Sequence, residues 1–303
     1  DRDVNLVMHV GDIHSGSMPC TSAEILPAIS TANPGWNQKI FYNFQQFNSP
    51  VVYTPGDNEW TDCHKSKEKS SGDPLKELAS LRSLFFSKPG ITLGEEKRVM
   101  SQAQFYDRNF PTDAQFVENV TWIQHQVVFT TVNMPGSNND TVAWSGAFAN
   151  PELQAKEVAE RTAANIRWLQ AAFKLAEKNH APAVVIGLQA DMWDPEAITG
   201  DGLDQYTTFV QTLADLATSF ARPVLLLNGD SHVYGADKPL ADPTSATGQI
   251  HHTQAVPNLT RITVQGSTNA PAEWLKLTIN PRKSEIFSWQ NIAYCSDPSG
   301  SCQ

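Results

Sequence analysis

Four short apolar segments of this chain end in the same kind of polar tip. They span residues 5–14, 50–59, 183–191 and 223–235, and each runs into a glycine that lies close to Asp, Asn, Gln or His. Continuous apolar runs bounded by turn residues are typical of parallel strands that are buried on both faces. Ligands and catalytic groups gather at the carboxyl ends of such strands. We therefore expect the four tips to meet in one polar rim.

Helical spacing of apolar residues lies between these segments. It predicts helices over 36–47, 75–86, 151–179 and 203–221. The second of these follows Asp73-Pro74, a favourable helix cap with proline in the first turn. The alternation of strands and helices indicates an α/β fold.

Period-2 patterns add further strands. Residues 116–123 and 126–133 are expected to form a hairpin, and 261–265, 273–279 and 284–289 a mixed sheet that closes a second layer. The segments 88–113, 134–150 and 236–258 are expected to be irregular, and His251 and His252 to be exposed in the last of them. We find no internal repeat and no linker, so residues 1–303 are predicted to form a single domain.

Composition narrows the possible partners. The chain is 40% hydrophobic and 18% charged, as expected of a globular protein, and no apolar run reaches the length of a membrane span. A net charge of −10 argues against a nucleic-acid surface. Asp12, Asp57 and Asp230 at the rim would repel phosphate, so an anionic substrate would require bound metal.

The four cysteines favour an oxidising compartment. Cys20 and Cys63 each follow a rim segment and are expected to form one disulfide, and Cys295 and Cys302 another that pins the tail 291–303. Four free thiols in a cytosolic protein are the alternative. We expect export to the periplasm or the extracellular space. The signal peptide is not in this chain, and we expect its N-terminus to result from cleavage.

The rim segments together resemble the motifs of the calcineurin-like metallophosphoesterase superfamily. HVGDIH is similar to the second motif and PGDNE to the third, whereas IGLQAD and NGDSHVYG are similar to the fourth and fifth. The resemblance implies a four-layer α/β/β/α sandwich with two mixed sheets. The first motif has no counterpart in the chain. Either it lies on a strand upstream, which we favour, or GDIH itself serves in its place.

The resemblance also implies metal ligands. Asp12 matches the carboxylate that bridges two metal ions, and His232 would complete the first site. The second site would be held by the remaining rim positions, namely Asp57, Gln189 and Asp230. Three of these positions carry oxygen donors where the family has Asn or His, which favours Mn²⁺, Mg²⁺ or iron over Zn²⁺. Asp191 in place of Gln189, or loss of the second site, are alternatives.

The implied activity is hydrolysis of a small phosphate ester, a monoester or a diester, by a hydroxide that bridges two divalent metal ions. Asn58 stands where the family has an acid-like His, and it could hydrogen-bond a phosphoryl oxygen without donating a proton. The leaving group would then take its proton from water, His14 or His64, while Glu59 orients its neighbours.

The sequence bears on two other functions. The replacements at the rim also fit a non-catalytic descendant of the fold that binds a ligand or a single cation there. A serine hydrolase of the α/β type is excluded by the absence of a Gly-x-Ser-x-Gly motif.

Overall fold

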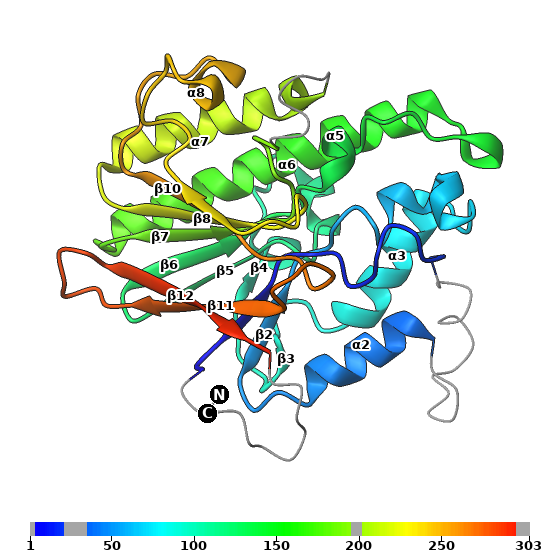
Figure 1. The fold of residues 1–303 in the computed structure, drawn as a ribbon, viewed down its shortest axis with the longest axis horizontal. Coiled ribbons are helices and arrows are strands. Elements are labelled where there is room, and N and C mark those ends of the chain that lie inside the picture. Colours follow the sequence, from blue (N-terminus) through cyan, green and yellow to red (C-terminus); the bar gives the residue numbers. More distant parts are fainter. Residues whose placement is uncertain (1–3, 21–34, 195–201, 295–303) are drawn as a thin grey trace.

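The computed structural model describes residues 4–20, 35–194 and 202–294, and these residues form a mixed α/β structure (Figure 1). The smaller main sheet has the order β1-β2-β3 and consists of β1 (Val7–His9), β2 (Pro50–Tyr53) and β3 (Leu93–Gly94). β1 and β2 run parallel, and β3 is antiparallel to β2. This small sheet therefore carries two of the four predicted rim strands.

The larger sheet has seven strands in the order β4-β5-β6-β7-β8-β10-β9. They are β4 (Met100–Ser101), β5 (Val120–Gln124), β6 (Val127–Thr131), β7 (Val184–Gly187), β8 (Val224–Asn228), β10 (Leu259–Thr263) and β9 (Gly235–Asp237). The central strands β6, β7, β8 and β10 are parallel, and the outer strands are antiparallel to their neighbours. The other two rim strands, β7 and β8, lie side by side in its middle.

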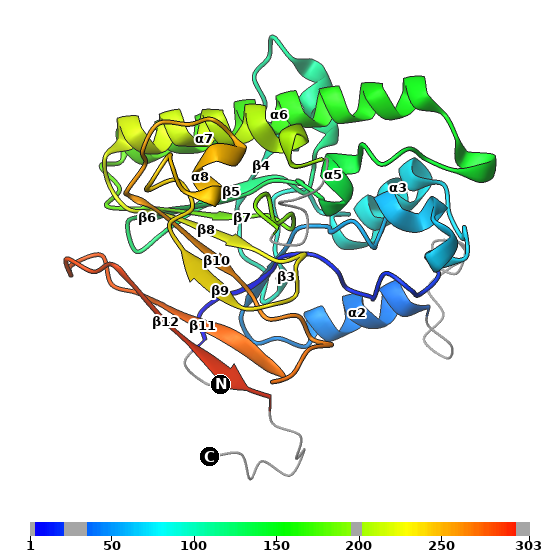
Figure 2. The same cartoon turned by 45° about the horizontal axis from the view of Figure 1, so that its top comes forward.

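The four long predicted helices are present. They are α2 (Trp36–Gln45), α3 (Pro74–Phe85), α6 (Pro151–Lys178) and α7 (Thr207–Phe220), and α7 follows a single 3-10 turn over Leu203–Tyr206. Asp73 caps α3 as predicted, since its carboxylate accepts hydrogen bonds from the amides of Leu75 and Lys76. Helices α6 and α7 cover the large sheet, whereas α2 and α3 lie beside the small one (Figures 1 and 2).

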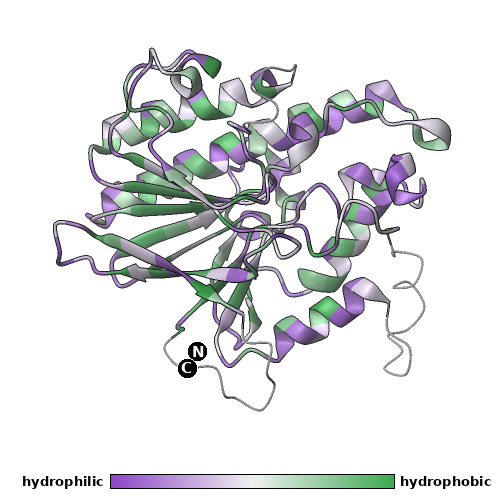
Figure 3. Ribbon diagram, viewed as in Figure 1, coloured by the Kyte–Doolittle hydropathy of each residue, from purple (hydrophilic) through white to green (hydrophobic). Residues whose placement is uncertain are grey.

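Three apolar clusters lie between successive layers. In β8, Val224 and Leu226 face α6 and α7, whereas Leu225 and Leu227 face the space between the two sheets. This alternation is the period of two of a strand that is buried on both faces. The third cluster packs Val51 and Tyr53 of β2 against α2 and α3. Helix, sheet, sheet and helix thus follow one another, with apolar positions along the strands (Figure 3).

The pairing of the terminal strands differs from the prediction. The strand predicted at 261–265 is β10, and it joins the large sheet by pairing in parallel with β8. The last two, β11 (Glu273–Ile279) and β12 (Phe287–Ala293), form a separate two-stranded sheet that packs onto the cluster between the main sheets. An alternating pattern specifies which face of a strand is buried but not which strand it pairs with. The prediction that these three strands form one sheet was therefore wrong.

The segments predicted to be irregular contain short elements. Besides β3, β4 and β9, these include α4 (Gln102–Phe105), α5 (Gly136–Asp140) and α8 (Ala246–Ile250). His252 is exposed, as predicted, but the prediction for His251 was wrong, because that ring is fully buried. Its Nε2 lies 2.8 Å from the Met192 carbonyl and its Nδ1 3.0 Å from the Thr207 hydroxyl. Local sequence gave no sign of these distant partners.

The disulfide predicted between Cys20 and Cys63 is present, and it ties the segment after β1 to the segment after β2. The pair predicted between Cys295 and Cys302 lies outside the described residues. Within the described ranges, no helix combines the length and the apolar character needed to cross a lipid bilayer.

Candidate functional site

Three carboxylates from three separate loops meet where the two main sheets converge. Asp12 follows β1, Asp57 follows β2 and Asp230 follows β8, and each offers an oxygen within 4.8 Å of the others. We call these three residues the carboxylate cluster. The polar rim predicted from the strand ends is therefore formed, although its strands come from two different sheets.

The loops that carry the cluster have unusual backbones. Asp12 and Asp230 adopt left-handed conformations, with φ of 56° and 72°. Gly56 and Gly136 allow the close approach, because a Cβ at Gly56 would collide with Asp12 Oδ1 and one at Gly136 would lie 2.5 Å from Asp230 Oδ1. Backbone conformations of this kind cost free energy and tend to occur at functional sites.

Gln189, which follows β7, lies in the middle of the cluster. Its Nε2 is 3.1 Å from Asp12 Oδ2 and 3.0 Å from an oxygen of each of Asp57 and Asp230. The orientation of the amide is fixed at its other end, because Oε1 accepts the hydrogen bond of the Gly136 backbone N–H. Gln189 thus presents its NH₂ group, and not a ligand oxygen, to the three carboxylates.

The cluster has the donors and the electrostatics of a cation site. Burial, followed by the neighbouring carboxylates, raises the pKa of Asp12 and of Asp230 well above the ordinary value, and burial also raises the pKa of Asp57. Asp12 Oδ1 is buried and has no hydrogen-bond partner among the residues that the structure describes. The two hydrogens of the Gln189 amide cannot serve three carboxylates fully. A divalent cation would neutralise this excess of negative charge, so the residues fit one.

His232 does not join the cluster. Its side chain is exposed, and it is absent from the group of ligand atoms around Asp12. Its backbone carbonyl accepts hydrogen bonds from Gly266 and Asn269. Asp191, the alternative ligand, is engaged elsewhere, because its carboxylate binds Arg261 and the Ser231 hydroxyl.

The residues predicted to assist catalysis line the nearby loops. Asn58 donates through Nδ2 to the His14 carbonyl, 3.3 Å away. His14 is buried, and its Nδ1 lies 3.2 Å from the Ser15 carbonyl. Its Nε2 has no hydrogen-bond partner among the described residues. His64 is also buried, and its Nδ1 accepts the backbone N–H of Ser145.

Glu59 lies where an orienting residue would be expected. It is fully buried, and its Oε1 accepts hydrogen bonds from the Ile13 amide at 3.0 Å and the Tyr53 hydroxyl at 2.9 Å. The first of these bonds fixes the backbone directly after Asp12. Glu59 therefore holds the loop that positions a cluster carboxylate.

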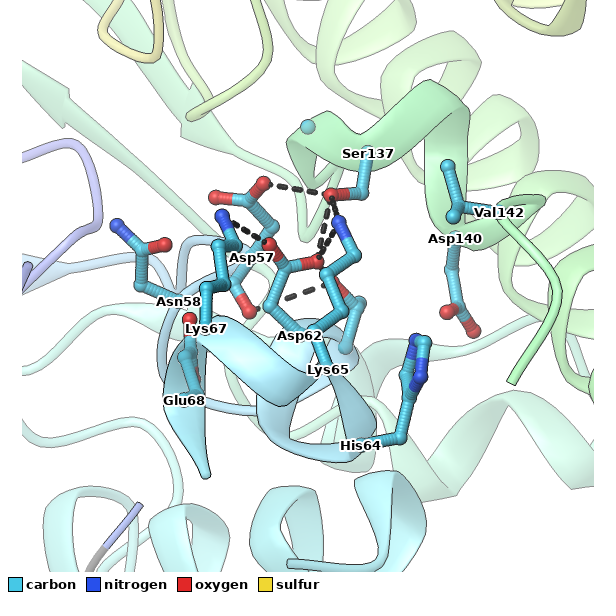
Figure 4. Close-up of polar contacts among 12 residues, drawn as sticks. Asp57, Asn58, Asp62, His64, Lys65, Lys67, Glu68, Ser137, Asp140 and Val142 are labelled. Atoms are coloured by element: carbon cyan, nitrogen blue, oxygen red, sulfur yellow. Dashed lines mark hydrogen bonds and ion pairs between the residues drawn. The ribbon is translucent and has the colours of Figure 1, made fainter. Parts of the chain in front are cut away.

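Sequence reasoning missed a second polar group beside Asp57. The Ser137 hydroxyl lies 2.8 Å from Asp57 Oδ2, next to Asp62, and accepts a 2.7 Å hydrogen bond from Lys65 Nζ (Figure 4). Asp62 is buried and forms ion pairs with Lys65 at 2.6 Å and Lys67 at 2.9 Å. Burial opposes ionisation of Asp62, but Lys65 and the other donors hold its pKa below the ordinary value.

Ser137 belongs to a left-handed turn. The four residues Ser137, Asn138, Asn139 and Asp140 all have φ between 50° and 63°, so α5 is left-handed over this stretch. Left-handed backbone costs about 1–2 kcal/mol per residue. The turn is held by buried partners, because Arg161 binds the Asn139 side chain at 2.6 Å and Gln154 binds the Asp140 carbonyl at 2.6 Å. The run Gly-Ser-Asn-Asn-Asp was the only signal in the sequence for such a turn.

Comparison with known proteins found no family model that matches the chain and no matching curated protein.

Proposed function

We propose that this protein is a metal-dependent phosphoesterase whose carboxylate cluster holds a divalent cation. The observation that supports this most is the convergence of Asp12, Asp57 and Asp230 from three loops. One buried Asp12 oxygen has no partner within the described part of the chain. Carboxylate oxygens suit Mn²⁺ and Mg²⁺. The resemblance of the four strand ends to the metallophosphoesterase motifs and the mixed α/β sandwich support the same proposal.

The roles of the chain's own residues follow from their contacts. Asp12, Asp57 and Asp230 would hold the cation, which would supply Lewis acidity and charge neutralisation for a phosphate ester. Ser137 and Gln189 orient Asp57 from either side, through Oδ2 and Oδ1. Asn58 uses one amide hydrogen for its bond to the His14 carbonyl and has a second to offer. His14 Nε2, which has no partner among the described residues, would receive or deliver a proton.

The Gln189 amide favours a second candidate, a non-catalytic protein that binds a ligand or one cation at the same rim. Its NH₂ group donates toward all three carboxylates and so leaves fewer oxygen ligands for the two cations that the implied hydrolysis uses. The phosphoesterase remains our first choice, because all four strand ends resemble the metallophosphoesterase motifs and Asn58 and His14 lie on the loops beside the cluster. The disulfide fits an exported protein under either proposal.

Titration of the EDTA-treated protein with Mn²⁺ and Mg²⁺ tests the proposal, together with assays on 4-nitrophenyl phosphate and bis(4-nitrophenyl) phosphate. We expect Asp12→Asn to weaken cation binding by more than about tenfold and to remove most of the hydrolysis. Asp215→Asn, an exposed change on α7, is the control and should leave both unchanged.

The outcomes separate the two candidates. Cation binding that depends on Asp12, combined with hydrolysis of either ester, supports the phosphoesterase. Cation binding without hydrolysis of any ester supports the binding protein. If neither cation binds and neither ester is cleaved, the phosphoesterase proposal is wrong.

A further inference from the structure

Two lysines share one buried carboxylate beside the cluster. Asp62 has a side-chain exposure of 1%, and both Lys65 and Lys67 form ion pairs with it. Glu68 lies next to them but does not compensate the second lysine, because burial raises its pKa to about 9 and keeps it protonated at neutral pH. Among the described residues, one positive charge is therefore left over at this side of the site.

The two lysines differ in what they can reach. The Lys65 side chain is 21% exposed, and its Nζ is engaged by both Asp62 and Ser137. The Lys67 side chain is 51% exposed and has Asp62 as its ion-pair partner. Lys65 therefore positions Ser137, whereas Lys67 still has N–H donors to offer to solvent or to a bound anion.

Lys67 lies on the side of the site where Asn58 is found (Figure 4). Gly16 shows how close the two are, since a Cβ there would lie 2.8 Å from Lys67 Nζ and 2.5 Å from Asn58 Oδ1. Burial lowers the pKa of Lys67, but the hydrogen bond and charge of Asp62 and the charge of Asp57 outweigh it, so the pKa is raised. A side chain at position 16 would collide with both groups, so glycine there lets Lys67 and Asn58 lie close together.

We propose that Lys67 forms an anion subsite beside the carboxylate cluster, which selects the dianionic phosphate of a monoester over the monoanionic phosphate of a diester. The selectivity between esters rests on the proposed function. Three carboxylates and one divalent cation leave a net charge of −1, which would repel a dianion. The surplus lysine charge offsets that repulsion, and it matters most for the more highly charged phosphate.

The test measures binding of inorganic phosphate and of dimethyl phosphate in the presence of Mn²⁺, by isothermal titration calorimetry and ³¹P line broadening. Lys67→Met removes the charge and keeps most of the apolar stem. We expect it to weaken phosphate binding by at least about tenfold, the value of one charge-assisted hydrogen bond, and dimethyl phosphate binding by less than about threefold.

Two further variants make the result specific. Lys67→Arg keeps the charge and should retain phosphate binding within a few-fold of the wild type. Lys88→Met removes another exposed lysine that is ion-paired, to Glu96, and should change nothing. Equal thermal stability of the variants would show that the folded protein is being compared.

The inference is overturned if wild-type protein binds no phosphate, if folded Lys67→Met binds it as the wild type does, or if both anions lose affinity equally. Failure of the proposed function looks different. In that case phosphate binds and depends on Lys67, but neither a monoester nor a diester is cleaved.

Discussion

The side-chain amide of Gln189 lies in the middle of three carboxylates. It is the residue that relieves the repulsion among them when no metal is bound. Its NH₂ group donates toward Asp12, Asp57 and Asp230, while Gly136 fixes its oxygen. A neutral donor at this point relieves part of the repulsion among the carboxylates. We therefore expect Gln189 to set the balance between stability of the apoprotein and affinity for a cation.

Gln189→Glu would replace that donor by a fourth carboxylate. The variant should melt at a lower temperature than the wild type in EDTA, since it adds repulsion at a fully buried position, and should bind Mn²⁺ more tightly by about tenfold. Calorimetry with and without Mn²⁺ measures both. The exposed change Gln115→Glu is the matched control. Unchanged cation affinity in Gln189→Glu would show that the cluster does not bind the metal.

Glu68 makes stability depend on pH. Burial, followed by the charge of Asp62, raises its pKa from 4.5 to about 9. The folded state therefore keeps a proton that the unfolded chain has lost, and unfolding releases it between these two pH values. The stabilising contribution is complete below about pH 4.5 and is lost as pH rises toward 9.

In Glu68→Gln the side chain cannot titrate. We expect its free energy of unfolding to fall less steeply than that of the wild type between pH 5 and pH 8, by up to about 1.4 kcal/mol per pH unit. Urea unfolding at several pH values gives the slope. Identical slopes for variant and wild type would contradict the raised pKa.

At the level of elements, the left-handed turn of α5 depends on α6. Arg161 of α6 is fully buried, and it binds the Asn139 side chain and carbonyl as well as Glu157 one turn away. These contacts hold the strained turn that places Ser137 beside Asp57. A long helix from one part of the chain thus shapes a loop of the site.

Arg161→Met keeps much of the side-chain volume but leaves Glu157 and the turn without their partner. We expect the free energy of unfolding to drop by about 3–5 kcal/mol, as is usual when one partner of a buried pair is removed. Lys156→Met on the same helix removes an exposed pair with Glu160 and should cost less than about 1 kcal/mol. Similar losses in both variants would mean that Arg161 does not anchor the turn.

At the scale of the whole molecule, the disulfide closes a long loop between two parts of the site. Cys20 and Cys63 are 43 residues apart in sequence and join the segments after β1 and β2. Replacing both by serine should lower the free energy of unfolding by about 4 kcal/mol, because the unfolded chain regains the entropy of an open loop. Urea unfolding measures this. Equal stability of wild-type protein with and without reductant would contradict it.

The long elements and much of the core could be predicted from the sequence. Apolar patterns predicted the four long helices and most of the longer strands, and in β8 the continuous apolar run also indicated burial on both faces. The four polar tips were found in the same way, because a strand end is a local signal. Asp12, Asp57, Gln189 and Asp230 lie together in the structure, whereas His232, which was predicted to join them, does not.

How these parts combine could not be predicted and is seen in the fold. It assigned β1 and β2 to one sheet and β7 and β8 to another, and it brought Ser137 and Lys65 to Asp57. It also turned the NH₂ group of Gln189 toward the carboxylates. The local pattern of apolar residues specifies only which face of an element is apolar. Strand partners, amide orientation and a left-handed turn are instead fixed by hydrogen bonds between residues far apart in the chain.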